Sequence, residues 1–422
     1  MAYNRVMFHD CIIMAGGSGT RLWPASNSYC PKQFLNIPGG GTFFQAALER
    51  AFAVTEADGK VLIVTGNSHV PHVMKACESL PETQKQRVVV IPEPAGRNTA
   101  PAIACAAVYI TRTSSKQTSL QPPPNKQVNP KAQAKHPVLV LTSDHIIEPL
   151  KDFIADALAA AELAKSDHLV VFGIQPSRPE TGFGYIEAGP AMAALDARAF
   201  QVMSFREKPD LATAEEFLAK GTFFWNSGMF AFDVHFMLSQ FRQHAPAILA
   251  PFEQLGQPDE DHVEQLNMPG PDRAGSQGGL TLVSRWPGLE TAYNTVPSIS
   301  IDYAIAEHCT SVAMVASRFQ WTDVGSWDEY AKVLEKSGKT TQGVSDDTTT
   351  EQQAAIFTAD SSNCFVDSDI PVALCGVEDL IVVVRSGKGG GIPSVLICKK
   401  GDSQQVKTIV EAIRKSNRGD LL

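Results

Sequence analysis

The stretch CIIMAGGSGTRLWP, residues 11–24, joins a short apolar run to a cluster of glycines. The run at 11–15 lacks polar alternation, which is typical of a strand buried on both faces of a parallel sheet. In an open α/β sheet, ligands bind beyond the carboxyl ends of the strands, and glycines there let backbone N–H groups approach phosphates. The stretch therefore predicts a first strand followed by a phosphate-binding loop.

Similar apolar runs recur along the chain and alternate with amphipathic segments. This alternation is typical of strands and covering helices, so we expect an α/β fold with a doubly wound, mostly parallel, Rossmann-like sheet. The strands are expected at VLIVT from 61, VVVIP from 88, VLVLT from 138 and LVVFG from 169, and the helices at 43–52, 71–79, 101–111 and 152–165.

A polar linker at 336–350 is the predicted boundary between domains at 1–335 and 351–422. The second domain contains short β-like segments and a final helix at 404–415, so we expect a small β-rich C-terminal module, for which a partial β-helix is left open. The segment 113–136 is rich in Gln, Pro, Lys and Ser and is interpreted as a disordered insertion. A second surface loop is expected at 268–279.

Composition limits the class of protein. Lys and Arg total 36 against 45 Asp and Glu, a formal charge of −9. The chain therefore lacks the excess of positive charge that is typical of nucleic-acid-binding proteins. Because no apolar run reaches about 18 residues, no membrane association is expected. The eight cysteines include no CxxC pair, so they are interpreted as reduced thiols of a cytoplasmic protein.

The glycine loop differs from two common phosphate-binding motifs. It lacks the GxxxxGK[ST] pattern of a Walker A loop and the GxGxxG pattern of a dinucleotide site, and the second predicted strand ends without a carboxylate. A dehydrogenase is therefore disfavoured. Arg21 and Lys32 flank the glycines and could neutralise a triphosphate, although each alone would more often be a solvated surface charge.

Four motifs together resemble the mannose-1-phosphate guanylyltransferases: GGSGTRLWP at 16–24, PKQF at 31–34, EPAGRNTAP at 93–101 and FWNSGMF at 224–230. The resemblance covers nearly the whole chain. It implies an enzyme that transfers GMP from GTP to α-D-mannose 1-phosphate, giving GDP-mannose and pyrophosphate. Two alternatives stay open: a nucleotidylyltransferase for another base or hexose 1-phosphate, and a non-catalytic regulatory homologue that binds a sugar nucleotide.

The resemblance also implies roles for particular residues. Catalytic roles fall to Arg21, Lys32, Asp144 and Lys208, and the sugar phosphate is expected to contact Gly184, Glu207, Lys208 and Asn226. The nucleotide is expected to contact Ala15, Gly16, Gly17, Ser18, Gly19, Thr20, Arg21, Lys32, Glu93, Asn98 and Thr99. For Asn98 and Thr99, helix capping is an alternative that is compatible with ligand binding.

Two aspartates are predicted to hold a catalytic Mg²⁺. Asp144 directly follows a predicted strand, and Asp323 lies in WTDVGSW, where Gly325 permits a tight turn and the two tryptophans anchor it. Mg²⁺ usually takes only one or two protein carboxylates, so two aspartates suffice. His145 is interpreted as structural. The histidines at 69, 72, 168 and 235 lack partners at metal-ligand spacing, so a zinc site is not expected. A homodimer is left open.

Overall fold

The computed structural model describes residues 7–17, 19–37, 40–117, 134–192, 198–263, 279–336, 355–387 and 391–422. The chain divides into two compact units. The first unit comprises Met1–Gly16, Ala47–Ser143 and Ile147–Trp321, and the second comprises Gly17–Ala46, Asp144–Ile146 and Thr322–Leu422.

An 11-stranded sheet forms the centre of the first unit, in the order β10-β11-β3-β2-β1-β4-β9-β6-β12-β8-β7. The strands are β1 (Asp10–Met14), β2 (Val61–Gly66), β3 (Val88–Glu93), β4 (Pro137–Thr142), β6 (Leu169–Ile174), β7 (Gly184–Ala191), β8 (Ala199–Glu207), β9 (Phe223–Asp233), β10 (Asp259–Val263), β11 (Leu280–Arg285) and β12 (Val312–Ala316). The five strands predicted from apolar runs are β1, β2, β3, β4 and β6, and each lies where the sequence indicates.

The sheet is parallel on one side and largely antiparallel on the other. Strands β11, β3, β2, β1 and β4 pair in parallel, with Ile12 opposite Leu62 and Val140. Beyond β4 the direction reverses, because β9 pairs antiparallel with both β4 and β6, and β7 and β8 form an antiparallel pair. The predicted α/β fold is confirmed. Apart from β6, the strands beyond β4 are not among those that the apolar runs mark.

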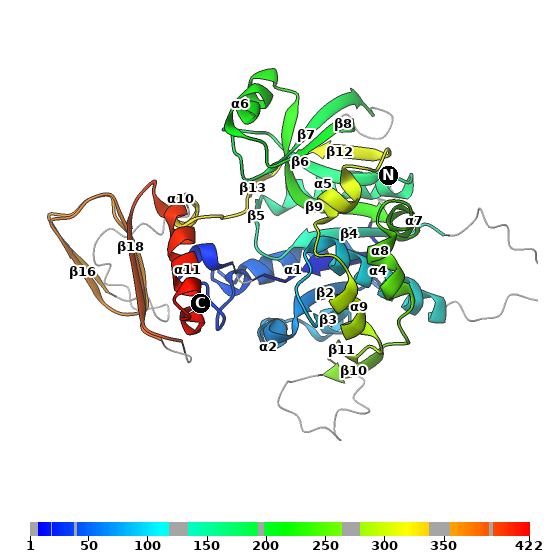
Figure 1. Cartoon of the computed structure of the whole chain (residues 1–422), viewed down its shortest axis with the longest axis horizontal. Helices are drawn as coiled ribbons and strands as arrows, with labels where there is room; N and C mark the ends of the chain where they lie inside the picture. Colours follow the sequence, from blue (N-terminus) through cyan, green and yellow to red (C-terminus); the bar gives the residue numbers. More distant parts are fainter. Residues whose placement is uncertain are drawn as a thin grey trace, which may run out of the picture. The chain divides into compact units, whose positions relative to one another are not determined.

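Helices cover both faces of this sheet. Helices α4 (Thr99–Gln117), α7 (Val234–His244) and α8 (Pro246–Glu253) pack against one another, and α5 (Leu150–Lys165) packs on β4, β6, β9 and β12 (Figure 1). Ile12 belongs to the core cluster that includes α4, while its neighbour Ile13 is equally buried. Alternate side chains of β1 therefore face opposite layers.

Further helical elements are short or join the strands. Among them are α1 (Phe43–Val54), η3 (Asn67–His69), α2 (Val70–Cys77), α3 (Glu82–Lys85), α6 (Leu211–Lys220), α9 (Leu289–Thr295) and the π-helix η5 (Asp302–Ala306). The predicted helices at 43–52, 71–79 and 152–165 correspond to α1, α2 and α5. Within the described ranges, no helix has the length and apolar character that a membrane crossing requires.

The segment predicted as an insertion begins inside a helix. Helix α4 continues to Gln117, beyond the predicted end at 111, and residues 118–133 lie outside the described residues. At the other end His136 is buried, so it belongs to the folded part of the first unit. The predicted loop at 268–279 and the predicted linker at 336–350 also lie almost wholly outside the described residues.

The second unit combines the glycine-loop region with the C-terminal part of the chain. Leu22, Trp23 and Phe43 share one hydrophobic cluster with Trp327 and Tyr330. The Trp327 indole donates to the Trp23 carbonyl at 2.9 Å, and the Tyr330 hydroxyl donates to the Asn36 carbonyl at 2.8 Å. This packing groups Gly17–Ala46 with Thr322–Leu422, whereas the sequence places residues 17–46 in the N-terminal domain.

The C-terminal strands coil with a regular period. β14 (Ile356–Ala359) pairs in parallel with β16 (Val372–Cys375), and β15 (Phe365–Ser368) pairs in parallel with β17 (Leu380–Arg385). In both pairs the paired residues are 16 positions apart in the sequence, 356 with 372 and 365 with 381. Parallel pairing at a fixed offset is the pattern of a β-helix. Antiparallel β18 (Ser394–Lys399) and then α11 (Val406–Lys415) follow, so the predicted small β-rich module is confirmed.

The other elements are β5 (Ile146–Glu148), η1 (Thr20–Leu22), η2 (Lys32–Phe34), β13 (Gln320–Thr322), α10 (Trp327–Lys336), η6 (Ser403–Gln405) and η7 (Gly419–Leu421).

Candidate active site

Ala15 fixes the point at which β1 passes into the glycine loop. It is fully buried, its amide donates to the Val64 carbonyl at 2.8 Å, and its carbonyl accepts from the Thr65 hydroxyl at 2.9 Å. The next residue, Gly16, is exposed. A rigid strand end thus leads directly into exposed glycine backbone, which is the arrangement that phosphate binding requires. Ser18 lies outside the described residues.

Gly19 is required by the close approach of Lys32. Its φ is +60°, in the left-handed region, and a Cβ built on it would lie 2.2 Å from the Lys32 Cβ. The Ser26 hydroxyl donates to the Gly19 carbonyl at 2.8 Å and holds this turn, after which Thr20–Leu22 form a 3-10 turn. No side chain larger than glycine's hydrogen fits here without displacing the Lys32 stem.

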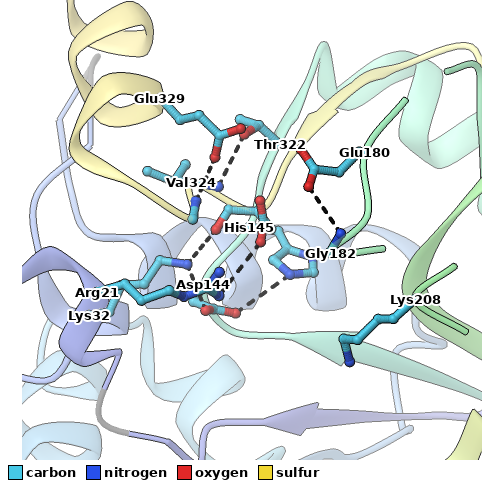
Figure 2. A network of polar contacts seen from close by, with 12 residues as sticks. Arg21, Lys32, Asp144, His145, Glu180, Gly182, Lys208, Thr322, Val324 and Glu329 are labelled. Carbon is cyan, nitrogen blue, oxygen red and sulfur yellow. Dashed lines mark hydrogen bonds and ion pairs between the residues drawn. The ribbon is translucent and has the colours of Figure 1, made fainter. Parts of the chain in front are cut away.

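Lys32 is the centre of a polar network in the second unit (Figure 2). Its side chain is only 6% exposed, and its ammonium group donates to the Asp144 carboxylate at 2.8 Å and to the Asp323 carbonyl. A buried charge is costly unless it is paired and hydrogen-bonded. Lys32 therefore brings together two aspartates that are far apart in the sequence.

Arg21 contributes a second cation to the same network. Its guanidinium lies 3.8 Å from the Asp323 carboxylate, and its side chain is 55% exposed. At that distance and exposure the pair contributes little to stability. The exposed guanidinium keeps donors for other partners, and Arg is well suited to phosphate because its planar fork offers several N–H groups.

The turn that carries Asp323 is strained at Val324. This β-branched residue has a φ of +45° and is 1% exposed. Its amide donates to the Thr322 hydroxyl at 3.1 Å, and the following Gly325 amide donates to the Glu329 carboxylate at 2.7 Å. Such a conformation costs on the order of 1–3 kcal/mol and persists only where the surroundings enforce it.

The predicted reasons for this turn hold in part. The left-handed residue is Val324 and not Gly325, but a Cβ on Gly325 would lie 3.1 Å from the Asp323 carboxylate, so the close approach does favour glycine. Of the two tryptophans, Trp327 packs in the cluster of the second unit, whereas Trp321 contacts Phe183 in the first unit, with ring centroids 5.1 Å apart. Glu329, one helical turn after Gly325, is the anchor that sequence reasoning missed.

The two aspartates differ in acidity. Burial opposes ionisation of Asp144. The charge of Lys32, the interaction with His145 and the Lys32 hydrogen bond outweigh burial and lower the pKa of Asp144 to about 2. Burial raises the pKa of Asp323 to about 6. The positive charge of Lys32 lowers this pKa, whereas the negative charge of Glu329 raises it further. The His145 ring nitrogen lies 3.7 Å from Asp144.

Asp144 and Asp323 offer the oxygen ligands that Mg²⁺ prefers. Their charges interact, because Asp144 is among the groups that raise the pKa of Asp323. A divalent cation bound between these two carboxylates would offset their repulsion. Mg²⁺ also usually keeps positions for phosphate and water, so the donor set fits a hard divalent ion.

The residues predicted to bind the nucleoside lie in the first unit. Glu93 ends β3, is 7% exposed and would lie 3.6 Å from a Cβ on Gly16. Its Oε1 is buried without a hydrogen bond of ordinary geometry, and burial raises its pKa to about 7 although the nearby Tyr293 hydroxyl opposes the shift. Such a buried, unsatisfied polar atom is a group that a ligand could satisfy.

Asn98 and Thr99 are partly engaged in structure. Asn98 has a φ of +67°, and its side-chain oxygen accepts from the Thr99 amide at 2.8 Å. The Thr99 hydroxyl accepts from the Ile301 amide at 2.8 Å. Each side chain therefore already has a local structural partner, and each keeps further hydrogen-bonding capacity.

The four residues predicted to bind the sugar phosphate are neighbours in the first unit. Gly184 pairs with Glu207 across β7 and β8, and a Cβ on Gly184 would lie 2.4 Å from the Glu207 carboxylate and 3.5 Å from the Asn226 Cβ. The Lys208 ammonium donates to Glu207 at 2.8 Å. The Lys208 side chain is 60% exposed and that of Glu207 only 10%.

Asp302 belongs to this group and was not predicted from the sequence. Its carboxylate accepts from the Asn226 amide at 2.9 Å. Burial and then the charge of Glu207 raise the pKa of Asp302 to about 6. Its only signal in the sequence is an acidic residue inside the apolar run ISIDYAIA. That signal becomes meaningful only when the fold places it beside Asn226.

Two family models match the chain. The model described as nucleotidyl transferase matches residues 10–340, and the one described as MannoseP isomerase/GMP-like beta-helix domain matches residues 356–413. The first match covers the sheet and the second covers β14 to α11. Nucleotidyl transferases are enzymes, and they generally use a divalent metal.

Similar proteins include mannose-1-phosphate guanylyltransferases. The one from Escherichia coli strain K12 is 34% identical over 96% of this chain and 74% of its own length, and that from Klebsiella pneumoniae is 32% identical over 97% and 74%. A crystal structure described as mannose-1-phosphate geranyltransferase from Thermus thermophilus has a TM-score of 0.69 and 26% identity over 96% of this chain and all of that one. The chain therefore belongs to the mannose-1-phosphate guanylyltransferase family of nucleotidyl transferases.

Proposed function

We propose that this protein transfers the GMP group of GTP to α-D-mannose 1-phosphate, forming GDP-mannose and pyrophosphate. The observation that carries the proposal is the buried Lys32 ammonium, which is hydrogen-bonded to Asp144 and to the backbone of Asp323, with the exposed Arg21 guanidinium beside Asp323. Two cations and two carboxylates arranged in this way suit the binding of a polyphosphate together with a divalent metal ion.

The reaction requires positioning and charge neutralisation. A phosphate oxygen of mannose 1-phosphate attacks the α-phosphorus of GTP in line, forming one P–O bond while the bond from the α-phosphorus to the bridging oxygen breaks. The leaving pyrophosphate keeps that electron pair. Because the nucleophile is already an anion, no general base is needed, and we assign Arg21 and Lys32 to neutralisation of the charge on the phosphates.

We assign Mg²⁺ to Asp144 and Asp323. Bound there, the ion would supply charge neutralisation at the α-phosphate and the leaving group. At neutral pH Asp144 is fully ionised, because its pKa is held at about 2. Its contact with Lys32 fixes the direction of the carboxylate, and the Gly325–Glu329 contact fixes the turn that carries Asp323.

The first unit supplies the groups that we assign to the nucleoside and the hexose. Glu93, Asn98 and Thr99 would read the base and ribose. Gly184, Glu207 and Asn226 would contact the sugar, and the exposed Lys208 ammonium would bind its phosphate. Support comes from the Glu207–Lys208 ion pair and the Asn226–Asp302 contact, which hold these side chains in defined positions.

One experiment separates this proposal from its alternatives. Pyrophosphate release is measured for GTP, ATP, UTP, dTTP and CTP, each with mannose 1-phosphate and glucose 1-phosphate. GTP with mannose 1-phosphate should give the highest kcat/KM. A preference for UTP or dTTP with glucose 1-phosphate would indicate another nucleotidylyltransferase, and binding without turnover for every pair would indicate a regulatory homologue.

A further inference from the structure

His9, Asp10 and His136 form a compact cluster at the amino-terminal side of the sheet. Asp10 is the first residue of β1, and β1 pairs in parallel with β4, so that Asp10 lies opposite Val138. His9 directly precedes β1 and His136 directly precedes β4. Each residue offers one ligand atom, and these atoms all lie within 4.8 Å of one another.

The three side chains are held from several directions. The His136 ring nitrogen Nε2 lies 2.7 Å from Asp10 Oδ2, and the His136 amide donates to the Asp233 carboxylate at 2.7 Å. The Lys60 amide donates to Asp10 Oδ1 at 2.7 Å. The Lys60 contact comes from outside the cluster, and outer-shell hydrogen bonds of that kind orient metal ligands in known sites. The His136–Asp10 contact joins two of the proposed ligand atoms, which a bound ion would separate.

His9 completes the cluster from the more exposed side. Its ring and that of His136 have centroids 3.9 Å apart with an interplanar angle of 31°. Its Nδ1 lies 3.3 Å from Asp10 Oδ1 but makes no hydrogen bond of ordinary geometry, although the atom itself is buried. The His9 side chain as a whole is 36% exposed, so solvent can reach the cluster.

We propose that His9, Asp10 and His136 bind a divalent transition-metal ion, with Zn²⁺ as the best match to two imidazoles and one carboxylate. Zinc bonds to nitrogen and oxygen are about 2.0–2.2 Å, which places tetrahedral ligand atoms roughly 3.3 Å apart. The observed separations of 2.7 and 3.3 Å fit this with small movements. Water would fill the fourth position.

This site is separate from the proposed catalytic metal site and has a different chemistry. Asp10 begins β1, whereas the glycine loop follows its other end, about 16 Å away at roughly 3.3 Å per residue. Imidazole ligands favour zinc over Mg²⁺, which prefers oxygen. Because the ligands come from segments 126 positions apart, a bound ion would cross-link β1 to β4 and stabilise the folded state.

The test uses the full-length protein after chelation and removal of the chelator. Titration with Zn²⁺ and with Co²⁺ should reveal a site of 1:1 stoichiometry that raises Tm, and bound Co²⁺ should show the visible absorption bands of a low-coordinate site. His9→Gln should weaken this binding by at least about 100-fold, the upper end of what losing an outer-shell partner costs. A large excess of Mg²⁺ should not compete.

His168→Gln is the matched control, because His168 directly precedes β6 as His136 precedes β4. It should bind zinc as the unmodified protein does. His9 is chosen as the main variant because it is the most exposed of the three and its loss should leave the fold intact, as circular dichroism would verify. The proposal is overturned if no 1:1 site is found, or if the site survives unchanged in His9→Gln.

Discussion

The Lys32 ammonium lies 2.8 Å from the Asp144 carboxylate, although 112 positions separate the two residues in the chain. This contact forms only when the strand that leads to Asp144 and the turn that carries Lys32 are both in place. Lys32 has two acceptors in the described network, the Asp144 carboxylate and the Asp323 carbonyl. It therefore links the proposed phosphate-binding loop to the proposed metal ligands.

Loss of either cation should lower turnover. Arg21→Ala and Lys32→Ala should each reduce kcat/KM by more than about tenfold, because each removes positive charge that we expect to face the transferring phosphate. Arg21 is 55% exposed, so its variant should fold normally. Steady-state pyrophosphate release is the measurement, with the exposed Lys332→Ala on α10 as the control. Unchanged kinetics in either variant would show that the replaced residue is a charge without a role in catalysis.

Gly184→Ala should damage sugar binding selectively. The added methyl group would lie 2.4 Å from the Glu207 carboxylate, so that carboxylate must move. We expect KM for mannose 1-phosphate to rise several-fold while KM for GTP changes little. Gly419→Ala is the control for the change of residue type, since a Cβ at that position would have nothing within 4 Å. Equal effects on both KM values would contradict the assignment of Glu207 to the sugar.

Glu93 should make stability depend on pH. Its pKa is raised from 4.5 to about 7, chiefly by burial, so the folded state binds its proton more tightly than the unfolded state does. The stability that this provides is complete below pH 4.5 and is lost as pH rises through 7, amounting to about 3 kcal/mol.

Glu93→Gln stays neutral, so it should gain stability relative to the unmodified protein as pH rises across that window. Denaturant unfolding at intervals from pH 4.5 to 8 measures the difference in free energy of unfolding. Glu78→Gln, an exposed carboxylate after α2, is the control. A difference for Glu93→Gln that is flat with pH would show that the Glu93 carboxyl is ordinarily acidic.

The parallel strands and their helices could be predicted because apolar runs report burial directly. The runs at 11, 61, 88, 138 and 169 correspond to five strands of the sheet. Antiparallel β7 and β8 carry no long apolar run, because buried and exposed side chains mix along them. A strand that is buried on one face leaves a weaker apolar pattern in the sequence than a strand that is buried on both faces.

Site residues that lie in sequence motifs could be predicted. Site residues that come together only through the fold could not. Lys32 and Asp144 each occupy a recognisable position after a strand or glycine loop. Asp302, Glu329 and the His9 cluster have no such context, because their partners lie elsewhere in the chain or their contact depends on a local backbone conformation. Side-chain contacts across long sequence separations cannot be read from spacing alone.

Asp323→Asn should lose turnover or need far more Mg²⁺, while folding normally. Asn keeps the size of Asp and most of its hydrogen bonding but removes the charge that a hard cation requires. The turn should survive, because it is held by backbone contacts: the Asp323 carbonyl accepts from Lys32, and Gly325 donates to Glu329. Asp144→Asn should behave similarly, although it also leaves the Lys32 ammonium without its charged partner. The measurement is the rate of pyrophosphate release across a Mg²⁺ titration, with the exposed Asp402→Asn as the control. A normal rate and an unaltered Mg²⁺ titration in Asp323→Asn would leave Asp144 as the sole protein ligand of the metal.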